Sequence, residues 1–240
     1  KNGLPYPPPH GAELALLAPY RKQLPAAVFG TGYIAPRTDT PAGLRGNLRL
    51  AQALLHAAGW RLGADNILRN AQGQKLELEY LDSGEASMRT VTPWARNLAK
   101  LGIVLSIRPT DFALYQARLQ TFDFDMTTIA YGGSLNPGQE YAEIFGSRAA
   151  DTPDSGNYAG VKSPVVDALV ARMVAAQSKA DLLPACRALD RVIAHSNYLI
   201  PQWAATSHRI VYNTQHLSRP ATMPPYAPGE DWAIQTWWAK

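Results

Sequence analysis

A short loop of small, polar and aromatic residues is the part of this sequence best suited to contact a ligand. Its six residues are Tyr131, Gly132, Gly133, Ser134, Leu135 and Asn136. The tyrosine offers a ring face and a hydroxyl, the glycines let a ligand approach bare backbone N–H and C=O groups, and the serine and asparagine can donate or accept hydrogen bonds. The loop therefore predicts a binding site, although a plain connection that needs glycines for its turn fits the same residues.

The residue sets that catalysis or metal binding requires are missing from the sequence. The five histidines have no metal-ligand spacing, and the single cysteine, Cys186, falls on the apolar face of an expected helix. There is no P-loop, no G-x-S-x-G elbow and no G-x-G-x-x-G motif. Asp123 and Asp125 are interpreted as solvated or capping groups. We therefore expect no catalytic residue, metal or cofactor; a hydrolase acting at the Tyr131 loop is the weaker alternative.

The composition is that of a globular protein, with 46% hydrophobic and 18% charged residues. The formal net charge is +4, but lysine and arginine are scattered along the chain, so a nucleic-acid partner is not expected. No run of 18 apolar residues is present, so we expect no membrane-spanning segment in this sequence. The tail tryptophans, Trp232, Trp237 and Trp238, suggest a sugar-stacking platform as an alternative function, although packing against a neighbouring element is the favoured interpretation.

Alternating helix and strand patterns predict an α/β fold for the first half of the chain. The expected elements are a helix over 41–58 capped by Thr40, a hairpin of 67–69 with 75–81, a helix over 87–101, a strand over 103–108, a helix capped by Asp111 and a buried strand over 124–130. This order implies two right-handed crossovers and a largely parallel sheet. Ligands of such sheets bind beyond the carboxyl ends of the strands, where the Tyr131 loop is expected to lie.

The second half of the sequence predicts mainly helices. A short helix is expected around 139–145, a second opens at Ser163-Pro164, and a third is expected to be capped by Asp181. Two further strands are expected over 199–204 and 209–212. The sequence shows no internal repeat.

An ordered set of short motifs resembles the family 5 extracellular solute-binding proteins, the peptide- and nickel-binding subunits of ABC importers. The helix over 47–60 ends in Ala58-Gly59-Trp60, as it does in that family. The other matching segments are 73–78, 97–108, Asp111 with Tyr115, 122–125 and 164–169. Finer matches resemble the branch that binds oligopeptides, including murein-derived or microcin-C-type peptides; they are 4–8, 157–161, 188–192, 201–203 and 237–238.

The resemblance implies a type II periplasmic-binding-protein lobe, with a central, largely parallel sheet flanked by helices. It implies that the chain corresponds to the carboxy-terminal part of such a protein. Residues 1–40 would lead from an amino-terminal lobe outside this chain, residues 41–213 would form the second lobe, and residues 214–240 would return to the first lobe. The implied partners are an oligopeptide ligand, the membrane permease of an ABC importer and the amino-terminal lobe, and the implied location is periplasmic or otherwise extracytoplasmic and membrane-attached.

The resemblance also implies roles for particular residues. In the family, the loop after the strand that carries the Asp-Phe-Asp motif, here 123–125, often reads tryptophan, two small residues and an aspartate that can pair with a peptide amino terminus. Tyr131 takes the tryptophan place and Ser134 takes the aspartate place, and a neutral serine cannot supply a full ion pair. Asn157 and Tyr158 are further candidates for the cleft wall.

Overall fold

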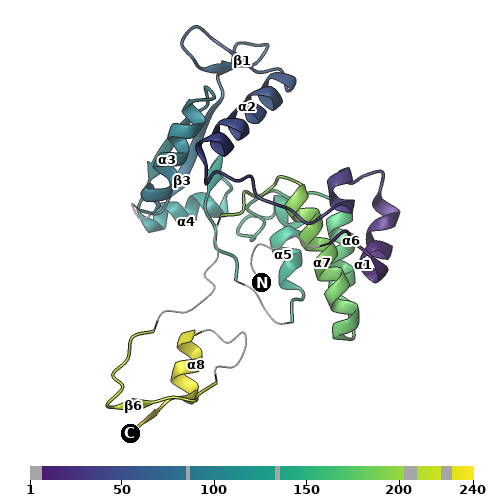
Figure 1. The fold of residues 1–240 in the computed structure, drawn as a ribbon, viewed down its shortest axis with the longest axis vertical. Coiled ribbons are helices and arrows are strands. Elements are labelled where there is room, and N and C mark those ends of the chain that lie inside the picture. The colour runs from purple at the N-terminus through teal and green to yellow at the C-terminus, as the bar shows by residue number, and fades with distance from the viewer. Residues whose placement is uncertain (1–6, 85–86, 133–135, 203–209, 223–228) are drawn as a thin grey trace.

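A three-stranded parallel sheet forms the centre of the first half of the chain (Figure 1). The computed structural model describes residues 7–84, 87–132, 136–202, 210–222 and 229–240. The strands β3 (Glu77–Asp82), β4 (Val104–Pro109) and β5 (Met126–Thr127) run in the order β4-β3-β5. The helices α3 (Met88–Ala99) and α4 (Phe112–Gln120) connect them. The α/β class and the parallel pairing expected from the sequence are confirmed.

Strand β5 is much shorter than the strand expected over 124–130. It spans two residues at an edge of the sheet, and none of residues 122–130 is fully buried. The chain turns at Phe122, which has a positive φ of 55°, and the Asp125 carboxylate accepts the Glu79 backbone N–H at 2.7 Å. Because this side chain occupies the donor that a backbone carbonyl would otherwise take, regular pairing with β3 begins only after Asp125.

The expected hairpin is also wrong in its pairing. The antiparallel partner of β2 (Leu68–Arg69) is β1 (Arg61–Leu62), whereas β3 lies parallel to β4 and β5. A single antiparallel bridge, between Arg69 and Lys75, remains of that hairpin. One residue further on, the Leu76 carbonyl already accepts the Val104 N–H, so the chain has joined the parallel sheet.

Side-chain caps fix several helix starts where the sequence placed them. Thr40 accepts the Gly43 N–H at the start of α2 (Pro41–Ala57), and Asp111 accepts the Leu114 N–H at the start of α4. Ser163 caps α6 (Pro164–Val174) in the same way. The cap predicted at Asp181 is wrong: α7 (Lys179–His195) begins earlier, and Ser178 Oγ accepts the Asp181 N–H at 3.2 Å.

A second core lies among the helices of the other half of the structure (Figure 1). Helices α6 and α7 pack against each other and against α1 (Gly11–Leu17) and α5 (Glu140–Phe145). The short 3₁₀ segments η1 (Ala18–Tyr20), η2 (Ala26–Phe29) and η3 (Ala149–Asp151) complete this group. The Asp154 N–H donates to the Gln120 carbonyl at 2.9 Å, which ties the group to the end of α4.

The C-terminal elements form a small unit that stands apart in Figure 1. Strands β6 (Leu217–Ser218) and β7 (Trp238–Ala239) pair antiparallel, and α8 (Gly229–Thr236) lies between them in sequence. No strand occurs in the described parts of the two segments expected as strands, 199–202 and 210–212; residues 203–209 lie outside the described chain. None of the helices that the structure describes is long and apolar enough to cross a membrane.

Candidate functional site

Polar side chains gather where the three parallel strands end. The Tyr80 hydroxyl, on the central strand, lies 2.6 Å from Thr128 Oγ1, and the Gln202 side-chain amide donates to the same oxygen at 3.1 Å. Thr110, which follows β4, donates its backbone N–H and its hydroxyl to the Asp82 carbonyl. We call Tyr80, Asp82, Ser87, Thr110, Thr128 and Gln202 the edge cluster. It occupies the position at which open parallel sheets bind ligands.

Tyr131 and Gly132 lie a few residues after β5 in the sequence. The Tyr131 ring centroid lies 5.9 Å from that of Phe145, and the residue remains 38% exposed. Partial burial, followed by the nearby Tyr158, raises the pKa of the Tyr131 hydroxyl to about 12. The hydroxyl therefore stays neutral around pH 7 and can both donate and accept. Nothing lies within 4 Å of the Cβ position of Gly132, so its backbone faces open space.

The four remaining candidate residues of the Tyr131 loop, 133–136, fall into two groups. Gly133, Ser134 and Leu135 lie outside the described residues. Asn136, together with Pro137, lines a shallow hollow of about 320 Å³ against the turn between α6 and α7. Two parts of the candidate loop are therefore placed, one beside the strand ends and one beside the helices.

Asn157 and Tyr158 have different surroundings. Asn157 is fully buried, and its side chain bonds the Gly146 carbonyl and both the carbonyl and the N–H of Val161 at 2.8–2.9 Å. These bonds give Asn157 a structural role, and we leave it out of the proposed ligand contacts. Tyr158 packs, partly buried, against the cluster formed by Leu81, Tyr115 and Leu119, and so lies near the Tyr131 ring.

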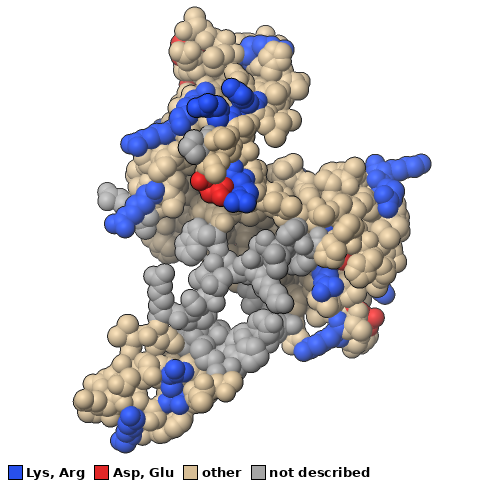
Figure 2. All heavy atoms as spheres, viewed as in Figure 1, with Lys and Arg blue, Asp and Glu red and all other residues tan. Residues whose placement is uncertain are grey.

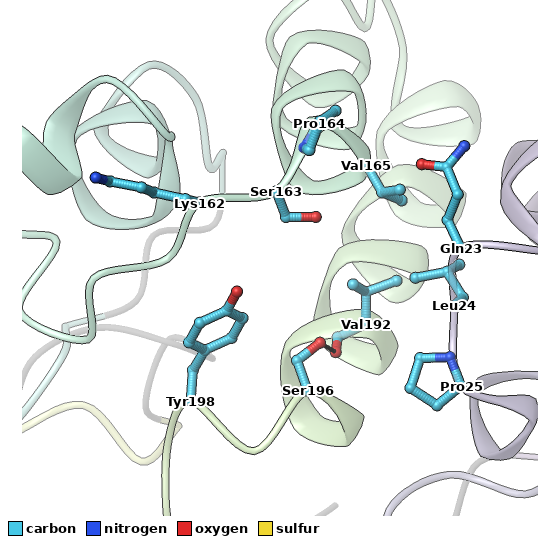
Figure 3. Close-up of a pocket in the computed structure, with 10 residues that line it drawn as sticks. All are labelled: Gln23, Leu24, Pro25, Lys162, Ser163, Pro164, Val165, Val192, Ser196 and Tyr198. Atoms are coloured by element: carbon cyan, nitrogen blue, oxygen red, sulfur yellow. Dashed lines mark hydrogen bonds between the residues drawn. The ribbon is translucent and has the colours of Figure 1, made fainter.

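A second hollow, of about 340 Å³, lies between the loop before η2 and the facing ends of α6 and α7 (Figure 3). None of the residues that the sequence predicted for the site lines it. The Lys162 ammonium points away from this hollow and pairs with Asp151, and Ser196 Oγ donates to the Val192 carbonyl (Figure 3). This leaves mainly apolar groups and the Tyr198 and Ser163 hydroxyls facing the space, a set with little to recognise a charged ligand.

Neither charged side chains nor possible metal ligands form a second candidate binding site among the described residues. Lysine and arginine side chains are spread over the visible face rather than gathered at one place (Figure 2). Within the described ranges, no three histidine, cysteine, aspartate or glutamate side chains are grouped so as to hold a metal ion. Cys186 is a half-buried free cysteine beside the helical core, and burial raises the pKa of its thiol.

The six residues of the edge cluster were not among the site residues predicted from the sequence, and Asp82 is the charged one among them. Asp82 ends the central strand and is buried, whereas the expected hairpin of 67–69 with 75–81 ended one residue before it and did not place it at a sheet edge. The available signal was an acidic residue directly after the apolar pair Tyr80-Leu81, which is where a parallel strand delivers a side chain to its carboxyl edge.

Comparison with known proteins gives consistent matches over most of the chain. Residues 15–152 match the family model described as bacterial extracellular solute-binding proteins, family 5 middle. The chain is 40% identical over 232 residues to the probable peptide-binding protein YejA of Agrobacterium fabrum, and 35% identical over 231 residues to YejA of Escherichia coli K12. Each match covers 96% of this chain and only 37% of the relative's length.

A solved structure shows the same fold at lower sequence similarity. The oligopeptide-binding protein AppA of Bacillus subtilis, determined in complex with a nonapeptide, superposes with a TM-score of 0.57 at 16% identity. The superposition covers 78% of this chain and 38% of AppA. The elements described above are thus arranged as in part of that larger binding protein.

Proposed function

The chain belongs to the family 5 bacterial extracellular solute-binding proteins, and on this premise we propose that it contributes to peptide binding in the solute-binding subunit of an ABC importer. The proposed ligand is an oligopeptide, the proposed partner is the importer's permease, and the proposed location is periplasmic or otherwise extracytoplasmic. A relative named as a probable peptide-binding protein, 40% identical, supports the ligand class.

The observation that carries the proposal is the open carboxyl edge of the parallel sheet. There Tyr80 and Gln202 of the edge cluster are hydrogen-bonded to Thr128. Tyr131, with its partly exposed ring, and Gly132, with its open backbone, follow Thr128 in the sequence. An extended peptide can pair its backbone with exposed N–H and C=O groups while a ring supports one of its side chains. We propose Tyr131 and Gly132 as ligand contacts, with Tyr158 supporting Tyr131. Gly133, Ser134, Leu135 and Asn136 stay proposed contacts on the strength of the sequence alone.

We also propose that residues 41–213 form the body of one lobe, and that the opposite wall of the cleft comes from the part of the relatives that this chain does not span. Residues 7–30 belong to this body as well, because Arg191 of α7 bonds Glu13, Gly30 and Pro7. Residues 214–240 remain the proposed return to the other lobe.

The sugar-binding alternative is not favoured by the tail tryptophans. Trp232 is buried, and its ring meets the Trp237 ring edge-on at 5.3 Å, while Tyr212 covers Trp237 at 4.6 Å. Trp232 and Trp237, packed against each other in this way, stabilise a small unit and leave little ring surface for a sugar, whereas Trp238 is 52% exposed.

We expect the full-length protein, purified under native conditions, to retain peptides that a mass spectrum of the released ligand identifies. Oligosaccharide in place of peptide would instead support the sugar-binding alternative. Release of hydrolysed peptide or ester products during incubation would indicate an enzyme.

Replacing Tyr131 by alanine is expected to weaken peptide binding by the full-length protein about 10-fold, or about 1.4 kcal/mol, because the ligand loses a ring face. Phenylalanine at this position should retain most of the affinity if the ring dominates. Tyr198→Ala is the matched control, since Tyr198 is equally exposed at 38% but lines the other hollow. Equal affinities of Tyr131→Ala and Tyr198→Ala in calorimetric titration would remove Tyr131 from the site.

A further inference from the structure

The described part of the chain contains two buried carboxylates, and only one of them has a cation. Glu13 and Asp82 are each 8% exposed. Glu13 Oε1 accepts a hydrogen bond from Arg191 Nε at 2.8 Å. Among the described residues, no lysine, arginine or histidine nitrogen lies within 4.0 Å of the Asp82 carboxylate. Because a buried charge without a partner is costly, Asp82 is the carboxylate whose placement the fold alone does not explain.

The hydrogen bonds of Asp82 leave one oxygen available. Ser87 Oγ donates to Oδ2, and Oδ1 accepts no hydrogen bond from the described residues. Oδ1 is not among the fully enclosed polar atoms that lack a partner, so this oxygen keeps some contact with solvent. The bond from the serine hydroxyl holds the carboxylate in one orientation without neutralising it.

Helix capping does not account for this carboxylate. Asp82 lies close to the start of α3, yet no backbone N–H of that helix donates to it in the described residues. Asp111, the neighbouring carboxylate on the same edge, shows the contrast: it is exposed, and its Oδ1 accepts the Leu114 N–H as the N-cap of α4.

Asp82 ends the central strand of the sheet, where a ligand at the carboxyl edge would pass. It pairs with Pro109 across β4, and the preceding residue, Leu81, pairs with Thr127 across β5. Its backbone carbonyl is bonded by Thr110, and Tyr80, two residues earlier on the same face of the strand, bonds Thr128. Asp82 is thus joined to the edge cluster through Ser87, which bonds its carboxylate, and through Thr110, which bonds its backbone carbonyl.

From these observations we propose that Asp82 binds a primary ammonium group of the ligand, most directly the amino terminus of a peptide. This inference rests on the proposed function and names the group that the site recognises. A ligand ammonium supplies the positive charge that the fold does not, and it can donate to Oδ1 while Ser87 keeps Oδ2.

The first test needs no variant. The full-length protein, stripped of bound ligand, is mixed with a pool of random hexapeptides lacking lysine and arginine, prepared with free or with acetylated amino termini. Native mass spectrometry and competition titration should show at least about 10-fold tighter binding of the free-amine pool. Equal binding of the two pools overturns the amino-terminal assignment while the peptide-binding function stands. Binding of neither pool overturns the proposed function and the inference with it.

A third pool, acetylated but containing lysine, distinguishes a side-chain ammonium from an amino terminus. Preference for this pool over the acetylated pool without lysine would keep the ammonium at Asp82 and move its source to a side chain. If neither the amino terminus nor lysine raises affinity, the proposal is wrong.

The second test compares two neutralised carboxylates of the same edge. Asp82→Asn is expected to lower affinity for the free-amine pool about 10- to 100-fold and to change affinity for the acetylated pool less than about 3-fold, which removes the preference. Asp111→Asn is the control, because asparagine caps helices as well as aspartate does, and it should retain the preference. A purely structural role for Asp82 predicts instead that both pools lose affinity in parallel, or that neither does.

Discussion

Replacing Arg191 by methionine is expected to lower the free energy of unfolding by about 3 to 5 kcal/mol, the usual cost of leaving one partner of a buried ion pair alone. The Arg191 guanidinium is almost completely buried in α7. It donates from Nε to Glu13, from Nη1 to the Gly30 carbonyl at 2.9 Å and from Nη2 to the Pro7 carbonyl at 2.8 Å. Its loss leaves a buried carboxylate and two backbone carbonyls without these donors.

Urea unfolding followed by circular dichroism measures this loss of stability, and two further variants serve as comparisons. Arg191→Met combined with Glu13→Met should recover part of the stability, since no unpaired charge then remains, but not the part due to Gly30 and Pro7. Lys162→Met breaks the exposed pair with Asp151 and should cost less than about 1 kcal/mol. An Arg191→Met variant as stable as Lys162→Met would show that the buried network does not hold residues 7–30 on α7.

The helices could be predicted from the sequence because their signals are local. Thr40, Asp111 and Ser163 each precede an apolar periodic run and each accepts an N–H of the first turn. At α7 the same signal is ambiguous, because Ser178 and Asp181 are both good capping residues and stand three apart. Only the structure shows that Ser178 accepts the Asp181 N–H, and that the Ser178 hydroxyl in turn donates to the Asp181 carboxylate.

Strand pairing and charge partners were harder to predict because they depend on residues distant in the chain. Nothing near 75–81 indicates that β3 pairs with β4 and β5 and not with residues 67–69. The Asp125 bond to the Glu79 N–H shortens β5 from 46 residues away, and Arg191 meets Glu13 across 178 residues. For the candidate site, the sequence indicated the Tyr131 loop through its glycines and aromatic, but the burial of Asp82 without a cation appears only once the sheet is assembled.

Asn157 illustrates how a polar residue in a loop can serve the fold, where the sequence predicts a ligand contact. The resemblance to the solute-binding family suggested that it faces the cleft, and polar residues in loops often do bind ligands. In the structure the side chain is enclosed and cross-links two stretches of backbone, one after α5 at Gly146 and one before α6 at Val161. A short polar side chain can satisfy three backbone groups only when it is buried among them, and nothing in the local sequence reports that burial.

We therefore expect Asn157→Ala to lower the free energy of unfolding by about 3 kcal/mol, since one backbone N–H and two carbonyls lose their buried partner. The loop that supports Phe145, and through it the Tyr131 ring, should loosen, so peptide affinity should fall only to the extent that this region opens in hydrogen exchange. Asn97→Ala is the matched control, because the Asn97 side chain makes one bond, to Lys100 Nζ, and alanine favours the helix; its stability should change by less than about 0.5 kcal/mol. An Asn157→Ala variant that keeps its stability but loses peptide affinity would show that Asn157 contacts the ligand. A variant that loses stability but keeps its affinity at low temperature would show that Asn157 acts by holding the cleft wall in position.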